Sequence, residues 1–300
     1  MKKIFGISLL VPLILSTGCS SFIKQTAVDS TGMVIEDALI SFFEEEDLEL
    51  AETATPSNLK LIEGLIKGSP NNQQLLLMGC RLYTSYAFGF LQEEYSADET
   101  KMAKNNKRSK VFHQRAMSYG MRILNKNESF KNTVNSSYED FEKSLKTFKK
   151  EDVPALFWTA HAWGNYVNLS KDDPDALGNL ARVELMMRRV MELDESYYNA
   201  GPHLFFMIYY GSRPPLLGGN PEKATLHYNK AKELTQGKFL MTDVMYAIYY
   251  AAQNQDQELF EKLLKNVIDT PASVFPQERL TNELAKRKAE TLLTLEEEIF

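Results

Sequence analysis

The 300-residue chain carries a formal net charge of −6 at pH 7 and contains only two cysteines, Cys19 and Cys80. The acidic balance argues against a nucleic-acid partner, because the negative phosphate backbone attracts basic proteins. With one cysteine beyond the N-terminal region, no intramolecular disulfide is expected there, even in an oxidising compartment. Cys80 lies in an apolar run, where we expect a buried and inert thiol.

The N-terminal residues have the pattern of a secretory signal peptide. Lys2 and Lys3 supply positive charge, and residues 4–15 form an apolar run that is too short to span a membrane. Small residues then precede Cys19, and a cysteine directly after a glycine resembles a bacterial lipoprotein signal. The resemblance implies that the Cys19 thiol receives a diacylglyceryl group, and Ser20 is similar to the residue found in lipoproteins passed on to the outer membrane. The alternative is an ordinary signal peptide with a chance cysteine.

The N-terminus therefore predicts a lipoprotein signal peptide at 1–18 and a mature chain at 19–300. The mature protein is expected in the periplasm, attached to the outer membrane through its lipid. Its length suffices for one elongated domain or two compact domains with a real core. We expect a single helical domain that follows a short N-terminal tether.

Apolar residues recur at spacings of three and four along almost the whole mature chain, which predicts an all-α protein. The segment 44–52 is expected to be an acidic turn or helix end. The lysines and arginines of 101–115 predict a basic helix face that either meets solvent or contacts an anion. The predicted helices lie near 25–46, 56–68, 72–94, 100–126, 137–148, 154–169, 174–193, 202–210, 221–236, 238–253, 255–269 and 276–298.

Helix starts in the second half of the chain indicate a repeat. Pro154 and Pro202 head similar apolar helices, and Pro174 and Pro221 head the helices that follow them. Helix pairs that recur at a period of roughly 34–48 residues are typical of an α-solenoid. The irregular period predicts inserted loops, one of them at 211–219.

The helix after Pro221 has small and aromatic residues at tetratricopeptide spacing. Ala224, Tyr228 and Ala231 match the second helix of such a repeat, in which small residues allow close approach and the aromatic ring fills the gap between repeats. The fold is therefore predicted to be an irregular tetratricopeptide-like helical-hairpin repeat.

Sequence motifs for catalysis, metals and cofactors are absent. The four histidines share no metal-ligand spacing, and Gly218-Gly219 lacks the Lys-Ser/Thr of a phosphate loop. We therefore expect no enzyme activity, no bound metal and no cofactor.

Polar and aromatic residues on the predicted first helices suggest a groove. In the helix 154–169, His161, Asn165 and Asn168 form one polar stripe on an otherwise apolar surface. The stripe is either a core helix with satisfied hydrogen bonds or the wall of a cleft. Aromatic clusters on the next two first helices favour a shared cleft. The candidate ligand or partner residues are Trp158, His161, Asn165, His203, Tyr210, Arg213 and Tyr246.

The loop 211–219 is longer than a plain hairpin turn, which needs about 2–5 residues. Two prolines stiffen it and its glycines permit positive φ. Arg213 is expected near the mouth of whatever the helices enclose. Leu216 and Leu217 either present an apolar surface to a partner or cap the core beneath the loop.

Four segments together carry a family resemblance, and the Arg-Pro-x-x-x-Gly-Gly motif in the last of them is the most specific. They are PSNLKLIEGLIKGSPNNQQLLLMGCRLYTSYAFGFL (56–91), PALFWTAHAWGNYVNL (154–169), DALGNLARVELMMRRVMELDESYYNAGPHLFF (175–206) and GSRPPLLGGNPEKA (211–224). The chain resembles the T component of tripartite ATP-independent periplasmic (TRAP) transporters, a family of lipoproteins.

The resemblance implies an all-helical periplasmic lipoprotein that associates with the solute-binding subunit of the transporter. It allows a homo-oligomer and implies no catalysis and no agreed ligand. Our hypothesis is an accessory binding protein whose groove holds the solute-binding subunit or a small hydrophobic ligand passed to it. The alternative is a scaffold lipoprotein of envelope or outer-membrane assembly, which is also built from helical repeats.

Overall fold

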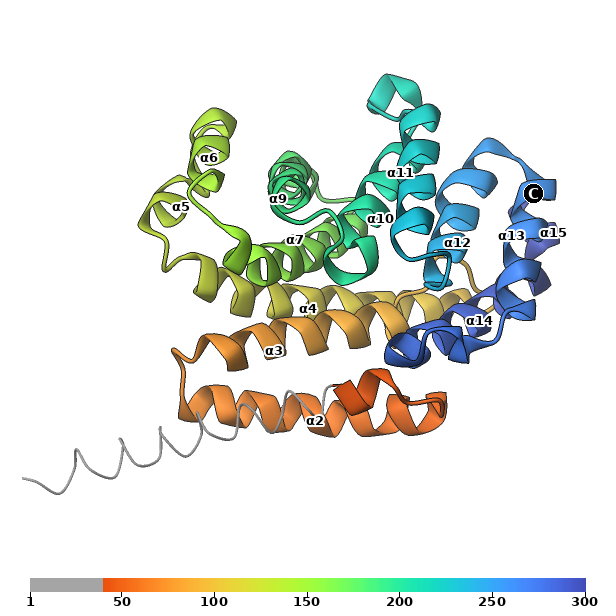
Figure 1. The fold of residues 1–300 in the computed structure, drawn as a ribbon, viewed down its shortest axis with the longest axis horizontal. Coiled ribbons are helices and arrows are strands. Elements are labelled where there is room, and N and C mark those ends of the chain that lie inside the picture. The colour runs from red at the N-terminus through yellow and green to blue at the C-terminus, as the bar shows by residue number, and fades with distance from the viewer. Residues whose placement is uncertain (1–39) are drawn as a thin grey trace, which may run out of the picture.

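The computed structural model describes residues 40–300, and every regular element in that range is helical (Figure 1). The predicted all-α class is confirmed. Cys19, the signal peptide and most of the predicted helix 25–46 lie outside the described residues. The α-helices are α2 (Leu48–Gly68), α3 (Gln73–Tyr86), α4 (Glu99–Leu124), α5 (Glu128–Thr133), α6 (Tyr138–Leu145), α7 (Val153–Asn168), α8 (Pro174–Gly178), α9 (Leu180–Leu193), α10 (Tyr197–Gly211), α11 (Pro221–Leu234), α12 (Met241–Tyr246), α13 (Gln257–Asp269), α14 (Arg279–Thr294) and α15 (Glu296–Ile299). Between residues 40 and 300 no helix is long and apolar enough to cross a membrane.

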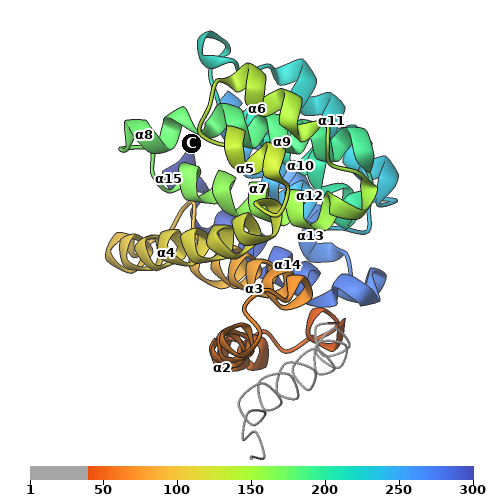
Figure 2. The ribbon, with the colours of Figure 1, turned by 90° about the vertical axis from the view of Figure 1, so that its left-hand side faces the viewer.

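The helices are stacked as successive pairs. Helices α2, α3 and α4 lie side by side, and α7 packs on both α3 and α4 (Figure 1). Three pairs follow along the chain: α7 with α9, α10 with α11, and α12 with α13. Figure 2 shows the same order from α2 through α3 and α4 to the paired helices. The arrangement is consistent with the predicted irregular solenoid.

The last long helix, α14, returns to the beginning of the described chain. It packs on α12 and α13 and also contacts α2. Two ion pairs hold this contact: Arg287 Nη1 lies 3.2 Å from Glu52 Oε2, and Arg279 pairs with Glu46. The first and last long helices of the described chain, α2 and α14, are therefore in contact with each other.

Helix α2 begins earlier than the sequence predicted. The segment 44–52 was expected to be a turn or helix end, but Asp47 is an N-cap whose Oδ1 accepts hydrogen bonds from the backbone N–H groups of Glu49 and Leu50. The helix then continues through Pro56. A proline in a helix interior is costly, and here the cost is offset because Leu59, Ile62 and Ile66 bury a full apolar stripe against the rest of the core.

The helix starts at the Asp-Pro and Asn-Pro motifs agree with the sequence analysis. Asp173 caps α8 and Asn220 caps α11, each through a side-chain oxygen that accepts backbone N–H groups. The predicted helix 174–193 is divided at Asn179 into α8 and α9.

A left-handed turn precedes the right-handed part of α10. Tyr198, Asn199 and Ala200 have φ values of 45°, 56° and 60°, so the right-handed helix begins at Gly201, next to the predicted start at 202. Such backbone costs about 1–2 kcal/mol per non-glycine residue. Gly201 is required because a Cβ there would lie 2.5 Å from the ring of Phe157.

Two of the predicted helices change to π-helix before they end. The predicted helix 72–94 becomes η1 (Ala87–Leu91), and the predicted helix 238–253 becomes η4 (Ala247–Ala251). A π-turn carries an extra residue, which shifts the following side chains around the helix axis, and such turns are frequent at functional sites. Phe88 and Tyr249, from these two turns, line the same cavity.

The crossing of α4 over α7 depends on a glycine. A Cβ at Gly120 would lie 2.0 Å from Thr159 Oγ1 and 3.2 Å from Cys80 Sγ. Cys80 is fully buried beside this crossing, and burial raises the pKa of its thiol to about 12. The predicted buried cysteine is confirmed, and a thiol that stays protonated is a poor nucleophile.

The pairing of α10 and α11 generates a stability prediction. Ala224 is fully buried at this contact, and its Cβ lies 3.5 Å from the position that a Cβ would take at Gly211. Ala224→Trp should overpack the pair and lower the free energy of unfolding by about 1–3 kcal/mol, measured by urea denaturation. Leu226→Trp is the matched control, since Leu226 is 63% exposed on the same helix. Equal denaturation midpoints for Ala224→Trp and the unmodified chain would contradict this packing.

Candidate functional site

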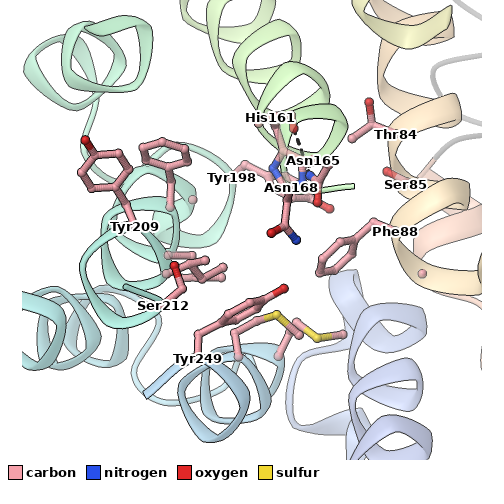
Figure 3. A pocket seen from close by; sticks show the side chains of 18 of the residues that line it. Thr84, Ser85, Phe88, His161, Asn165, Asn168, Tyr198, Tyr209, Ser212 and Tyr249 are labelled. Atoms are coloured by element: carbon pink, nitrogen blue, oxygen red, sulfur yellow. Dashed lines mark hydrogen bonds between the residues drawn. The ribbon is translucent and has the colours of Figure 1, made fainter. Parts of the chain in front are cut away.

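A cavity of about 510 Å³ lies between the stacked helices. Its wall is built from α3 with η1, from α7, α10, α12 with η4, and from α14 (Figure 3). Phe42 and Phe43 contribute at one end, and the loop after α10 contributes at the other. Most of the lining is aliphatic or aromatic, which is typical of a small-molecule site.

One face of α7 forms the most polar part of the wall. His161, Asn165 and Asn168 all line the cavity, so the predicted polar stripe faces it rather than only the core. Asn165 donates a hydrogen bond through Nδ2 to the carbonyl of His161 at 2.9 Å. Figure 3 shows the Asn168 amide pointing into the open centre, between Phe88 and Tyr249.

His161 is an uncharged group at neutral pH. Its ring lies among aromatic rings, with centroids 5.6 Å from Phe157, 5.8 Å from Trp158 and 5.9 Å from Phe88. Burial among these groups lowers the pKa of His161 to about 4. The deep part of the cavity therefore offers hydrogen-bonding groups without a formal charge.

Four of the seven candidate residues lie around this cavity: Trp158, His161, Asn165 and Arg213. Trp158 is only 2% exposed and meets the ring of Tyr198 edge-on at 4.6 Å. Whether these four bind a ligand stays a prediction, but the fold does bring them to one wall.

His203, Tyr210 and Tyr246 do not line this cavity. These residues face α11: Nδ1 of His203 lies 2.9 Å from Nδ1 of His227, and Tyr210 stacks on the His227 ring. Tyr246 stacks on Tyr228 at 4.0 Å. The physical reason is helical phase, because α10 and the continuous helix α12–η4 carry aromatic residues on both faces and the sequence alone does not tell which face turns inward.

A family model described as TRAP transporter T-component matches residues 44–300. The chain belongs to this family. An uncharacterized protein of Treponema pallidum (strain Nichols) is 23% identical over 257 residues, a match that covers 84% of this chain and 80% of the relative. The family description names a transporter component, so this T-component is an accessory part of a TRAP transport system.

The loop after α10 lies at the edge of the cavity of this T-component. Arg213 stacks on the Tyr209 ring at 3.6 Å, and its Nε and Nη2 donate to the Tyr209 carbonyl at 2.9 and 2.6 Å. Leu216 is 98% exposed and Leu217 is 68% exposed. Because both side chains are exposed, the interpretation in which Leu216 and Leu217 cap the core beneath the loop is excluded.

Tyr249, which is not among the seven candidate residues, also lines the cavity. Its hydroxyl donates to Glu94 Oε1 at 3.2 Å, and behind the lining Lys288 Nζ lies 3.6 Å from Glu94 Oε2. Tyr249 and Glu94 are 155 positions apart, so no local pattern could pair them. The only signal was the aromatic cluster that contains Tyr249.

In the part of the chain that the structure describes, no group of three or more histidine, cysteine, aspartate or glutamate side chains could hold a metal ion. The polar groups that line the cavity are instead suited to hydrogen bonding.

The lowered pKa of His161 predicts a pH-dependent stability. The unfolded chain takes up the His161 proton near pH 6.5 and the folded chain only near pH 4, so this histidine lowers the free energy of unfolding as pH falls through that window. His161→Phe should remove this loss. Between pH 7 and about pH 5 the variant should lose about 2 kcal/mol less stability than the unmodified chain, measured by urea denaturation at both pH values. The same loss in both proteins would show that His161 is charged in the folded state.

Proposed function

We propose that this T-component is a periplasmic, lipid-anchored accessory subunit that binds the TRAP solute-binding subunit and a small hydrophobic ligand. The single observation that supports it best is the apolar cavity with two exposed leucines at its edge. A ligand inside the cavity and a partner at its mouth would be close enough for transfer between the two proteins.

The cavity supports the ligand part of the proposal by its size and its lining. A volume of about 510 Å³ lies within the range of roughly 300–1,000 Å³ typical of small-molecule sites. Burial of apolar ligand surface there would stabilise the complex by roughly 25 cal/mol per Å². The neutral side chains of His161, Asn165 and Asn168 can orient a ligand without the cost of a buried charge.

The loop supports the partner part. Large apolar side chains that lie together in solvent favour association, and Leu216 and Leu217 project from a segment that two prolines stiffen. Gly219 allows the loop to fold back tightly on Arg213, since a Cβ at position 219 would lie 1.7 Å from the carbonyl oxygen of Arg213. A stiff loop loses little conformational entropy on binding.

The lipid anchor rests on Cys19. Cys19→Ser should abolish incorporation of a labelled fatty acid into the protein, because the thiol that carries the diacylglyceryl group is gone. Cys80→Ser is the matched control and should label normally, since Cys80 is buried. Labelling that persists in Cys19→Ser would remove the lipoprotein part of the proposal.

The partner surface is tested by charge on the loop. The double variant Leu216→Asp, Leu217→Asp should weaken binding to the TRAP solute-binding subunit of the same organism at least about tenfold, which is about 1.4 kcal/mol, measured by isothermal titration. Leu226→Asp is the control, because it places the same charge at an exposed leucine of α11. The thermal midpoints of both variants should match that of the unmodified chain.

Undiminished affinity in the double variant would place the partner surface elsewhere. If the unmodified chain bound no solute-binding subunit and captured outer-membrane assembly proteins instead, the scaffold alternative would replace the proposed function.

A further inference from the structure

The charged residues that line the cavity are both cations. They are Lys171 and Arg213, and no aspartate or glutamate of the described chain joins them in the lining. Within residues 40–300 neither cation has a carboxylate partner at ion-pair distance. The carboxylates of Glu94 and Glu184 lie behind the lining, on the hydroxyls of Tyr249 and Tyr209, and each has a basic partner of its own. The formal charge in the lining itself is therefore positive.

On α7 the lining becomes more polar toward the C-terminal end of the helix. Phe157 and Trp158 lie near its start, His161 and Asn165 follow, and Asn168 leads to Lys171 beyond the last turn. Positions on one helix face recur at intervals of three and four, so these side chains form one continuous strip. The strip runs from aromatic through neutral polar to cationic.

Helix α10 repeats the same order. Its lining begins with Tyr198 and Gly201, continues with Leu204, Phe205, Ile208 and Tyr209, and ends just beyond the helix with Ser212 and Arg213. Each helix pair reverses the chain twice, so α7 and α10 run in similar directions and their polar ends meet at one mouth of the cavity.

The third first helix supports the same polarity. In α12 and η4 the lining starts with Met241 and Met245 and ends with Tyr249, whose hydroxyl is shown in Figure 3 facing the cavity. Three neighbouring helices thus place apolar groups at one end of the cavity and polar or cationic groups at the other.

We propose that the cavity takes a single-tailed amphiphile whose anionic head, a carboxylate or a phosphate, lies between Lys171 and Arg213 and whose alkyl tail lies along Phe157, Leu204 and Met245. The inference rests on the proposed function and gives its ligand a chemical class. Arg213 donates hydrogen bonds through Nε and Nη2 to the Tyr209 carbonyl, which leaves Nη1 to donate to an anion.

The opposite end of the cavity does not suit an ionised head. The nearest cation there is Arg81, which lies behind the rings of Phe43, Trp158 and Tyr198 at 4.5, 5.5 and 5.7 Å and is not part of the lining. Burial raises the pKa of the Glu278 carboxyl, and the positive charge of Arg81 opposes that rise. An anion at that end would be buried among aromatic rings with only hydroxyl donors, such as the unpartnered Ser85 Oγ, and with no cation in the lining to balance its charge.

The test compares ligands that share a tail and differ in the head. The full chain carrying Cys19→Ser, which has no acyl group of its own, is loaded with the neutral fluorescent probe N-phenyl-1-naphthylamine near neutral pH. Decanoate, decyl phosphate and decanol are then used to displace the probe. At least one of the two anions should bind about tenfold more tightly than decanol, because a charge-assisted hydrogen bond contributes about 1.5–3 kcal/mol, and the stronger of the two identifies the head as carboxylate or phosphate.

Variants locate the head group. Lys171→Gln and Arg213→Gln should each weaken binding of the preferred anion about threefold to tenfold and leave decanol unchanged. Lys223→Gln is the matched control, since Lys223 lies over the ring of Tyr210 on the face away from the cavity and should change neither affinity. Lys171 is exposed, so Lys171→Gln is expected to fold. This variant therefore tests the head-group site even if Arg213→Gln does not fold.

Equal affinity for decanol and both anions, or an unchanged anion affinity in Lys171→Gln, would overturn the head-group assignment while the apolar ligand of the proposed function stands. Absence of probe binding to a folded chain would overturn both.

Discussion

The architecture depends on α7 being packed on almost every side. Its first face meets α4 at the Gly120–Thr159 crossing, and its N-terminal part meets the left-handed turn of α10 at Gly201 and Phe157. Neither contact tolerates a Cβ on the glycine, because the side chains of Thr159 and Phe157 occupy that space and pack directly on the glycine backbone. The one face that remains carries His161, Asn165 and Asn168, and that face becomes a cavity wall.

Departures from regular helix shape the cavity. The three left-handed residues before Gly201 redirect the chain so that Tyr198 packs on Trp158, and the π-turns η1 and η4 place Phe88 and Tyr249 opposite α7. Strained or irregular backbone persists where the surrounding packing compensates for its cost. Here the compensation is a dense aromatic cluster around Phe157 and Trp158.

The two ends of the cavity differ in character, and α14 forms part of the wall between them. At the end near Phe43 the wall is aromatic and backed by Arg81, and at the other end the loop with Arg213 and Leu217 meets solvent. A molecule with one apolar and one charged end would fit this polarity in a single orientation. In the proposed transfer to a solute-binding subunit, that partner would meet the charged end of the ligand first.

The sequence by itself determined the helical class, the helix starts at Pro174 and Pro221, and the buried Cys80, since these follow from local capping, backbone chemistry and periodicity. Its predicted start at 202 lies one residue after the right-handed start at Gly201. It also selected the α7 stripe, because a polar strip on an apolar helix is visible in one dimension. It did not decide which faces of α10 and of the continuous helix α12–η4 turn inward, since both carry aromatic residues on two sides. For this reason it grouped His203, Tyr210 and Tyr246 with the cavity residues, whereas they pack against α11. Only the tertiary structure fixed that phase, through the left-handed turn and the π-turns, and only it joined Tyr249 to Glu94 across 155 positions.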